Sequence, residues 1–149
     1  MIEKDKQSNI FIISGPSGVG KDTLMDIVAN NHPDTVHIAI TATTRKPRSN
    51  ESNGINHYFY NETEFKNLIN QNLLIEWAKV YDNFYGVPYS EITNNLNLGK
   101  KVLLRVDVQG ANRLKKIIPH SKFIFINPES EDDLMLRLKK RHQNSDVDI

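Results

Sequence analysis

The chain has 149 residues, which is enough for one domain with a sizeable hydrophobic core. Its 19 basic and 18 acidic side chains nearly cancel, so its charge predicts no general attraction to nucleic acid or to a membrane surface. The absence of cysteine excludes disulfides and thiolate metal sites. No apolar run approaches the roughly 18 residues that span a bilayer, and the start MIEKDKQSNI is no secretory signal, so we expect a cytoplasmic protein.

Short apolar runs alternate with segments of helical spacing along most of the chain. We predict strands over residues 9–14, 37–40, 55–60, 73–81, 101–108 and 122–127. Helices are predicted through Leu24, Ile27 and Val28, from a capping box at Asn61 and Glu64 through Ile69, from Pro88 to Gly99, over 109–117, and from Ser130 to about Arg141. This alternation indicates the α/β class, with a parallel sheet covered by helices on both faces. Residues 41–87 lack the alternation and are interpreted as an insertion that carries a ligand site.

The segment GPSGVGKDT between the first predicted strand and helix has the pattern of a phosphate-binding loop, G-x-x-x-x-G-K-[ST], with one exception. Its glycines allow successive backbone N–H groups to converge on a phosphate, and Lys21 is predicted to reach the β- and γ-phosphates of ATP. The predicted ATP-binding residues are Gly15, Pro16, Ser17, Gly18, Val19, Gly20, Lys21, Asp22 and Thr23. Asp22 is the exception, because a hydroxyl at this place normally helps to hold Mg²⁺. The metal geometry therefore stays open, and the simpler alternative is an ordinary glycine-rich turn.

A second group of residues resembles a site for a phosphorylated purine. Arg45 and Arg48 flank Pro47 in TATTRKPR, and two guanidiniums on one loop can clamp one phosphate. Aromatic rings and carboxylates that could hold a purine follow in His57, Tyr58, Phe59, Glu76, Trp77, Tyr85 and Asp107. Each residue alone has a simpler interpretation: the arginines as surface charges, the rings as core, and a carboxylate that ends a strand as a helix cap.

Five segments, FIISGPSGVGKDTL, TATTRKPR, LLIEWAKVYDNFYG, VDVQGA and LMLRLKKR, resemble the guanylate kinase family in order and spacing. The resemblance runs from Ile10 to Arg141 and implies a P-loop nucleoside monophosphate kinase fold that transfers the γ-phosphate of ATP to GMP with Mg²⁺. It divides a single domain, 1–149, into a core (8–40 and 88–130), a GMP-binding insertion (41–87) and part of a lid (131–149). Its small-molecule partners would be GMP and ATP, and the oligomeric state stays open.

The resemblance also implies a role for individual residues. The GMP phosphate would be held by Arg45 and Arg48, with help from Tyr85 and from His57, which stands where the family usually has a tyrosine. The guanine base would be read by Glu76 and Asp107, near Thr41 in the place of a usual serine. The transferring phosphoryl group would meet the catalytic residues Lys21, Arg45, Arg137 and Arg141. We predict no protein metal site built from the histidines.

Further departures from the family concern the base and the metal. Val87 replaces a small hydroxyl residue that would touch the guanine carbonyl, and Arg105 stands where an acidic residue is usual beside the metal site. The family also continues beyond this point, so we expect impaired stability and weak or absent turnover from these 149 residues. Two alternatives remain open. The first is a non-catalytic guanylate-kinase-like binding module, and the second is a related P-loop kinase for another phosphorylated small molecule.

Overall fold

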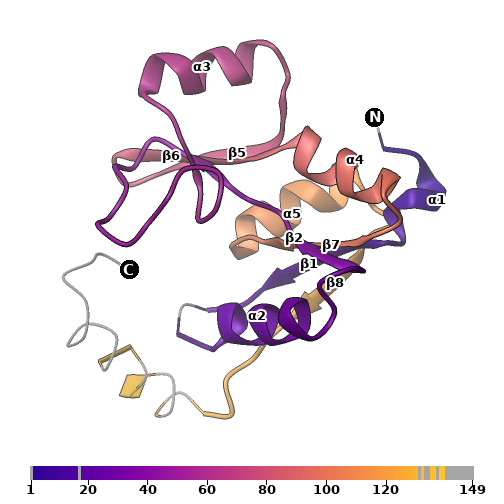
Figure 1. The fold of residues 1–149 in the computed structure, drawn as a ribbon. Helices are drawn as coiled ribbons and strands as arrows, with labels where there is room; N and C mark the ends of the chain where they lie inside the picture. The colour runs from indigo at the N-terminus through magenta and orange to yellow at the C-terminus, as the bar shows by residue number, and fades with distance from the viewer. Residues whose placement is uncertain (1, 17, 131, 133–134, 137, 140–149) are drawn as a thin grey trace.

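The computed structural model describes residues 2–16, 18–130, 132, 135–136 and 138–139. Two sheets lie side by side in it, with helices packed around them (Figure 1). In chain order the elements are α1 (Lys4–Gln7), β1 (Ile10–Ser14), α2 (Lys21–Asn31), β2 (Val36–Ile38), β3 (Ala42–Thr43), β4 (Tyr58–Phe59), α3 (Glu62–Asn70), β5 (Leu74–Val80), β6 (Asn83–Pro88), α4 (Tyr89–Asn97), β7 (Lys101–Arg105), α5 (Val108–Ile117) and β8 (Lys122–Phe125).

The core sheet is parallel and has the strand order β2-β7-β1-β8. Successive side chains of a strand point to opposite faces, so each face collects its own apolar set. Ile10 and Ile12 of β1 pack with Leu104 of β7 under helices α4 and α5, and Ile13 packs with Met25 of α2 on the other face. The predicted α/β class with a parallel sheet between helices is therefore confirmed.

The second sheet has the order β4-β3-β6-β5 and is mixed. Strands β5 and β6 form an antiparallel hairpin, β3 adds to β6 antiparallel, and β4 adds to β3 parallel. Phe65 of α3 is fully buried and stacks on Phe84 of β6, with ring centroids 5.4 Å apart, so α3 covers one face of this sheet (Figure 1). All four strands come from the segment that follows β2 and precedes α4.

Several local signals are confirmed in the structure. Asn61 and Glu64 form the predicted capping box, with the Asn61 side chain accepting from the Glu64 N–H at 2.8 Å and Glu64 accepting from the Asn61 N–H at 2.9 Å. Pro88 is the N-cap of α4, and Gly99 follows its last turn with φ +78°. Each of these ends is determined by residues within one helical turn, which is why the sequence indicates them.

Other predictions differ from the structure. Strands β3 and β6 lie where no strand was predicted, and β4 occupies only Tyr58–Phe59 of the predicted 55–60 strand. The helical spacing of Leu24, Ile27 and Val28 is present, but these side chains are exposed and Met25 is the buried contact of α2. The helix expected from Ser130 to Arg141 falls mostly outside the described residues. None of the helices in the described ranges combines the length and apolar character that crossing a bilayer requires.

Candidate functional site

The candidate site lies at one edge of the core sheet, where the parallel strands end. Strand β1 ends at Ser14, directly before the glycine-rich loop, and the neighbouring strand β7 ends at Arg105, paired in register with Ile13. Ligands of open parallel sheets bind outside the carboxyl ends of the strands, because the loops that follow the strands gather there. The sequence-predicted phosphate loop and Asp107 thus start from the same edge.

The phosphate loop is shaped by a close backbone approach at its first residue. Gly15 has φ +155°, and a Cβ atom there would lie 2.5 Å from the carbonyl oxygen of Ile126. Gly20 is the N-cap of α2, so the first N–H groups of this eleven-residue helix point toward the loop. The Lys21 ammonium donates to the Gly15 carbonyl at 2.8 Å, which folds its positive charge over the loop. The N–H groups of a helix N-terminus, with a lysine beside them, can donate hydrogen bonds to phosphate oxygens.

The side chain after the lysine is held by the neighbouring strand. Asp22 Oδ1 accepts a hydrogen bond from Arg105 Nη1 at 2.8 Å, and both side chains are partly exposed. These are the two positions at which the sequence departs from the family around the expected metal. The structure joins them as one ion pair. Thr23 is exposed on the first turn of α2, and Ser17 lies outside the described residues.

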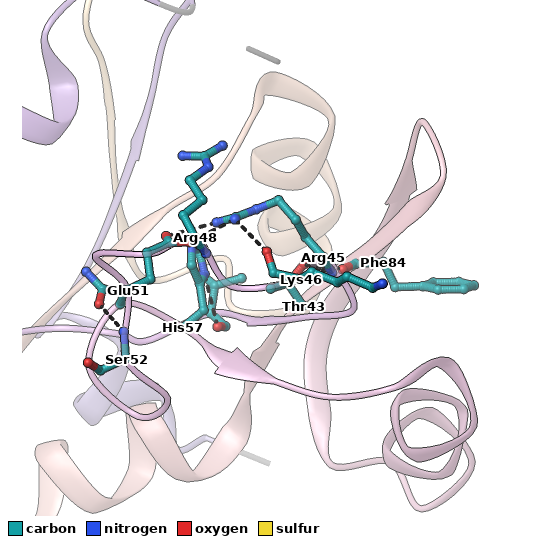
Figure 2. Close-up of polar contacts among 10 residues, drawn as sticks. Thr43, Arg45, Lys46, Arg48, Glu51, Ser52, His57 and Phe84 are labelled. Carbon is teal, nitrogen blue, oxygen red and sulfur yellow. Dashed lines mark hydrogen bonds and ion pairs between the residues drawn. The ribbon is translucent and has the colours of Figure 1, made fainter. Parts of the chain in front are cut away.

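The loop after β3 carries the predicted phosphate clamp, and it is organised by Glu51 (Figure 2). Arg45 donates to both oxygens of Glu51, from Nη1 at 2.8 Å and from Nη2 at 3.0 Å. The Arg48 backbone N–H also donates to Glu51, at 2.9 Å, whereas the Arg48 side chain extends outward past the pair in Figure 2. The hydrogen bond from Arg45 lowers the pKa of Glu51 to about 2, and the same bond raises the pKa of Arg45.

Thr43 connects this loop to the second sheet. Its fully buried hydroxyl donates to the Phe84 carbonyl at 2.9 Å and accepts from the Arg45 N–H at 3.1 Å. The next residue of β6, Tyr85, lies near enough to Arg45 to contribute to the raised pKa of the guanidinium. The Thr43 hydroxyl and the pairing of Thr43 with Tyr85 therefore bring together the two residues predicted to share a phosphate.

His57 lies beside the same clamp and is half-buried. Its Nδ1 lies 3.3 Å from the carbonyl oxygen of Thr41, and burial lowers the pKa of the imidazole, with the charges of Arg45 and Arg105 acting in the same direction. At neutral pH the ring is then uncharged. The contacts described for Thr41 are made by its backbone carbonyl, which also accepts from the Tyr58 N–H at 3.0 Å.

The predicted base-reading carboxylates lie where β5 faces the start of α5. Glu76 has a side chain only 7% exposed, and its Oε1 accepts from Arg113 through both Nε, at 2.9 Å, and Nη2. Burial raises the pKa of Glu76, while the hydrogen bond from Arg113 opposes that rise. Asp107 is exposed and caps α5, with Oδ1 accepting from the Gly110 N–H at 2.7 Å. One oxygen of each carboxylate is thus used within the protein.

Two partly exposed residues of this region escaped the sequence interpretation in their present roles. Arg113 pairs with a carboxylate 37 residues away, and Arg105 pairs with one 83 residues away, so neither contact leaves a local pattern. The spacing of Arg113 could have indicated its position. Arg113 follows Gly110 by three residues, so the two residues lie on nearly the same side of α5. Arg137 and Arg141, predicted to close over the phosphoryl group, lie outside the described residues.

Among the residues that the structure describes, no three His, Cys, Asp or Glu side chains come together as a metal-binding group.

Comparison with known sequences identifies close relatives. A profile of the guanylate kinase family matches residues 7–149. The chain is 43% identical over 144 residues to a guanylate kinase of Caldanaerobacter subterraneus subsp. tengcongensis, covering 97% of this chain and 69% of that protein. It is 37% identical over 144 residues to a guanylate kinase of Clostridioides difficile, covering 97% of this chain and 70% of that protein.

A solved structure shares the fold. The crystal structure of guanylate kinase from Anaplasma phagocytophilum superimposes with a TM-score of 0.68 at 33% sequence identity, over 90% of this chain and 65% of that one. The chain therefore spans about two thirds of the length of the proteins that it matches.

Proposed function

Since the chain belongs to the guanylate kinase family, we propose that it transfers the γ-phosphate of ATP to GMP, giving ADP and GDP. The observation that carries the proposal is the second sheet. This sheet presents Glu76 and the loop after β3 that carries Arg45, called here the acceptor loop, separately from the phosphate loop. A nucleotide-hydrolysing domain needs one phosphate site. A kinase of a phosphorylated acceptor needs two phosphate sites and a place for the acceptor's base.

We assign the donor site to the phosphate loop. Its backbone N–H groups and Lys21 are oriented for the phosphates of ATP, and the charge of Lys21 already lies over the loop at Gly15. The acceptor phosphate is assigned to Arg45, Arg48 and Tyr85, with His57 beside them. The base is assigned to the free oxygens of Glu76 and Asp107, which can accept from the ring N–H and amino groups of guanine.

Magnesium is expected to accompany ATP, but the described residues do not form a side-chain ligand set for it. One oxygen of Asp22 is bonded to Arg105, and a guanidinium at that distance repels a divalent cation. Mg²⁺ commonly keeps several waters and binds substrate phosphates with few protein ligands. We therefore propose that the ion arrives on ATP, and we assign no step of the transfer to a metal-holding side chain of the loop.

The reaction requires mainly placement and charge. An oxygen of the GMP phosphate forms a bond to the γ-phosphorus of ATP, while the bond from that phosphorus to the β–γ bridging oxygen breaks and its electron pair leaves with ADP. The lysine of the donor site and the arginines of the acceptor site reduce the repulsion between the two phosphate groups. The cytoplasmic location stays a prediction.

Calorimetric titration of the chain with GMP and, separately, with AMP tests this function. We expect GMP to bind about tenfold tighter than AMP or better, because Glu76 accepts from the guanine N–H groups and adenine offers no N1–H. Glu76→Gln should weaken GMP binding and leave AMP binding unchanged. Equal affinity for the two nucleotides, or no binding of GMP by a folded chain, would count against the proposal.

A further inference from the structure

Arg105 occupies the end of β7 that lies beside the phosphate loop. It pairs in register with Ile13, and the N–H of the next residue, Val106, donates to the Ile13 carbonyl at 3.2 Å. Strand β1 runs from Ile13 through Ser14 directly into Gly15. The Arg105 side chain therefore extends from a strand of the core sheet, at the edge where the donor phosphates are expected.

One contact fixes this side chain and leaves most of its donors available. Arg105 Nη1 donates to Asp22 Oδ1 at 2.8 Å, which uses one of the five N–H donors of a guanidinium. The side chain is 36% exposed, so it is neither buried in the core nor fully solvated. Asp22 belongs to the first turn of α2, and the contact therefore holds the guanidinium at the phosphate loop.

The charge of Arg105 also acts on the acceptor loop. It is one of the causes that lower the pKa of His57, together with burial and with Arg45. The other groups that act on His57 are the Thr41 carbonyl and Glu51, both belonging to the acceptor side. A single guanidinium therefore contacts the donor loop and acts electrostatically on the acceptor loop.

We propose that Arg105 is a further catalytic residue of this kinase. The guanidinium donors that Asp22 does not use bind the phosphoryl group as it passes from the phosphate loop to the acceptor loop. The inference rests on the proposed function. As the new bond to the GMP oxygen forms and the bond to the bridging oxygen of ADP breaks, negative charge spreads over the equatorial oxygens of the moving group. A guanidinium that Asp22 holds at the donor loop stabilises that charge without being brought in from solvent.

The competing interpretation is that Arg105 only neutralises Asp22. The two interpretations predict different binding by the variant in which both residues are replaced. If neutralisation is the whole role, the double variant Asp22→Asn with Arg105→Gln restores normal binding, because no unpaired carboxylate remains beside the phosphates. If Arg105 binds the phosphoryl group, the double variant recovers only the part of the loss that the unpaired carboxylate causes, and it still binds more weakly than the unaltered chain.

The experiment measures binding of a bisubstrate analogue, adenosine and guanosine joined 5′ to 5′ by a chain of five phosphates, whose central phosphates span the two sites. Titrations compare the unaltered chain, Arg105→Gln, Asp22→Asn, the double variant and Lys101→Gln, each also with GMP alone and ATP alone. Lys101 is the matched control, since it is an exposed cation at the opposite end of the same strand.

For Arg105→Gln and for the double variant we expect a loss of analogue affinity of roughly 10- to 100-fold, the range of a hydrogen bond between charged groups, with GMP affinity changed little. Lys101→Gln should bind as the unaltered chain does. Full recovery in the double variant, or undiminished analogue binding by Arg105→Gln, would overturn the inference while the proposed function stands. A folded, unaltered chain that binds no GMP would contradict the proposed function itself, and this inference with it.

Discussion

Glu51 shows how a single carboxylate prepares the acceptor loop. It accepts from both terminal nitrogens of Arg45 and from the Arg48 N–H, so it fixes one guanidinium and the turn that carries the other. A paired arginine of this kind loses little rotational freedom when a phosphate binds, because its orientation is set in advance. Arg45 keeps further N–H donors for a ligand while both its charge and its plane are held by Glu51.

Replacing this carboxylate by Glu51→Gln should cost about 1–2 kcal/mol of unfolding free energy at pH 7, because a bidentate charged pair becomes a single neutral contact. The folded pKa of Glu51, about 2, lies below its ordinary value of 4.5, so the pair stabilises the chain fully above pH 4.5 and progressively less as pH falls toward 2. Urea unfolding of both chains between pH 7 and pH 3 measures this difference.

Glu62→Gln is the control for that experiment. Glu62 pairs with Lys66 one turn along α3, at 2.9 Å, and both side chains are well exposed. Exposed pairs contribute little to stability, so this variant should unfold almost as the unaltered chain does at every pH. An equal loss in both variants would show that the acceptor loop is no more organised than the surface of α3.

The β5–β6 hairpin is the element on which the acceptor site depends. It carries Glu76 on one strand and Tyr85 on the other, and its register places Gly86 opposite Trp77. A Cβ atom on Gly86 would lie 3.1 Å from both the Glu76 carbonyl and the Trp77 Cβ, and 2.9 Å from the Leu74 side chain. The close approach of the two strands at Glu76, the proposed base-binding carboxylate, therefore needs a glycine.

Gly86→Ala should lower the unfolding free energy by about 1–3 kcal/mol, the usual cost of overpacking, and should also weaken GMP binding because β5 must shift at Glu76. Gly99→Ala is a useful contrast. Gly99 has φ +78° with open space around its Cα, so alanine there should cost about 1–2 kcal/mol of stability through backbone strain and leave GMP affinity unchanged. Thermal unfolding measures the loss of stability in both variants, and calorimetry measures their affinity for GMP. Equal GMP affinities of Gly86→Ala and Gly99→Ala would contradict the role given to Gly86.

The elements that could be predicted from the sequence are those with local causes. The apolar runs of β1 and β7 and the capping box at Asn61 lie within a few consecutive residues. Strand β3 could not be predicted, since two residues carry no periodicity, and β6 contains Gly86 and Pro88, which sequence rules assign to turns. Both strands exist because the second sheet supplies partners for them.

The candidate site was predictable to a similar extent. The sequence related both Asp22 and Arg105 to the expected metal site, and the structure joins these two residues as an ion pair. The partner of each side chain was not predictable, because Glu76 and Arg113 meet through the packing of α5 on β5. The ligand-binding role of each residue stays a prediction.

Across the whole molecule, Glu91 of α4 connects the two sheets. Its Oε1 accepts from His37 Nε2 at 2.9 Å and from the Ile40 N–H at 2.7 Å, on the side of β2, and its Oε2 accepts from the Tyr58 hydroxyl of β4 at 2.8 Å. Burial alone would raise the pKa of Glu91, but these hydrogen bonds hold it below its usual range. Burial and the contact with Glu91 also raise the pKa of Tyr58 to about 12.

Glu91→Gln should reduce the unfolding free energy by about 1–3 kcal/mol at pH 7, because three donors then face a neutral amide. Since the folded pKa is lowered, this contribution is present above the unfolded value near pH 4.3 and is lost as pH falls below it. Tyr58→Phe removes only the contact to the second sheet and should accelerate hydrogen exchange in β3 and β4 more than in β7. If hydrogen exchange accelerated equally in β3, β4 and β7 of this variant, Glu91 would not link the sheets.

The ion pair between Asp22 and Arg105 also constrains how such a sequence can change over generations. An acidic residue introduced at position 105 while Asp22 remains would set two carboxylates side by side at the phosphate loop, and the backbone N–H groups would then compete for ATP against added negative charge. A change at position 22 to a hydroxyl residue removes the carboxylate partner of Arg105 and creates no such repulsion. In either direction of exchange the intermediate that avoids this repulsion carries a hydroxyl residue at 22 together with arginine at 105, and ancestral sequences reconstructed along such a lineage should show that combination.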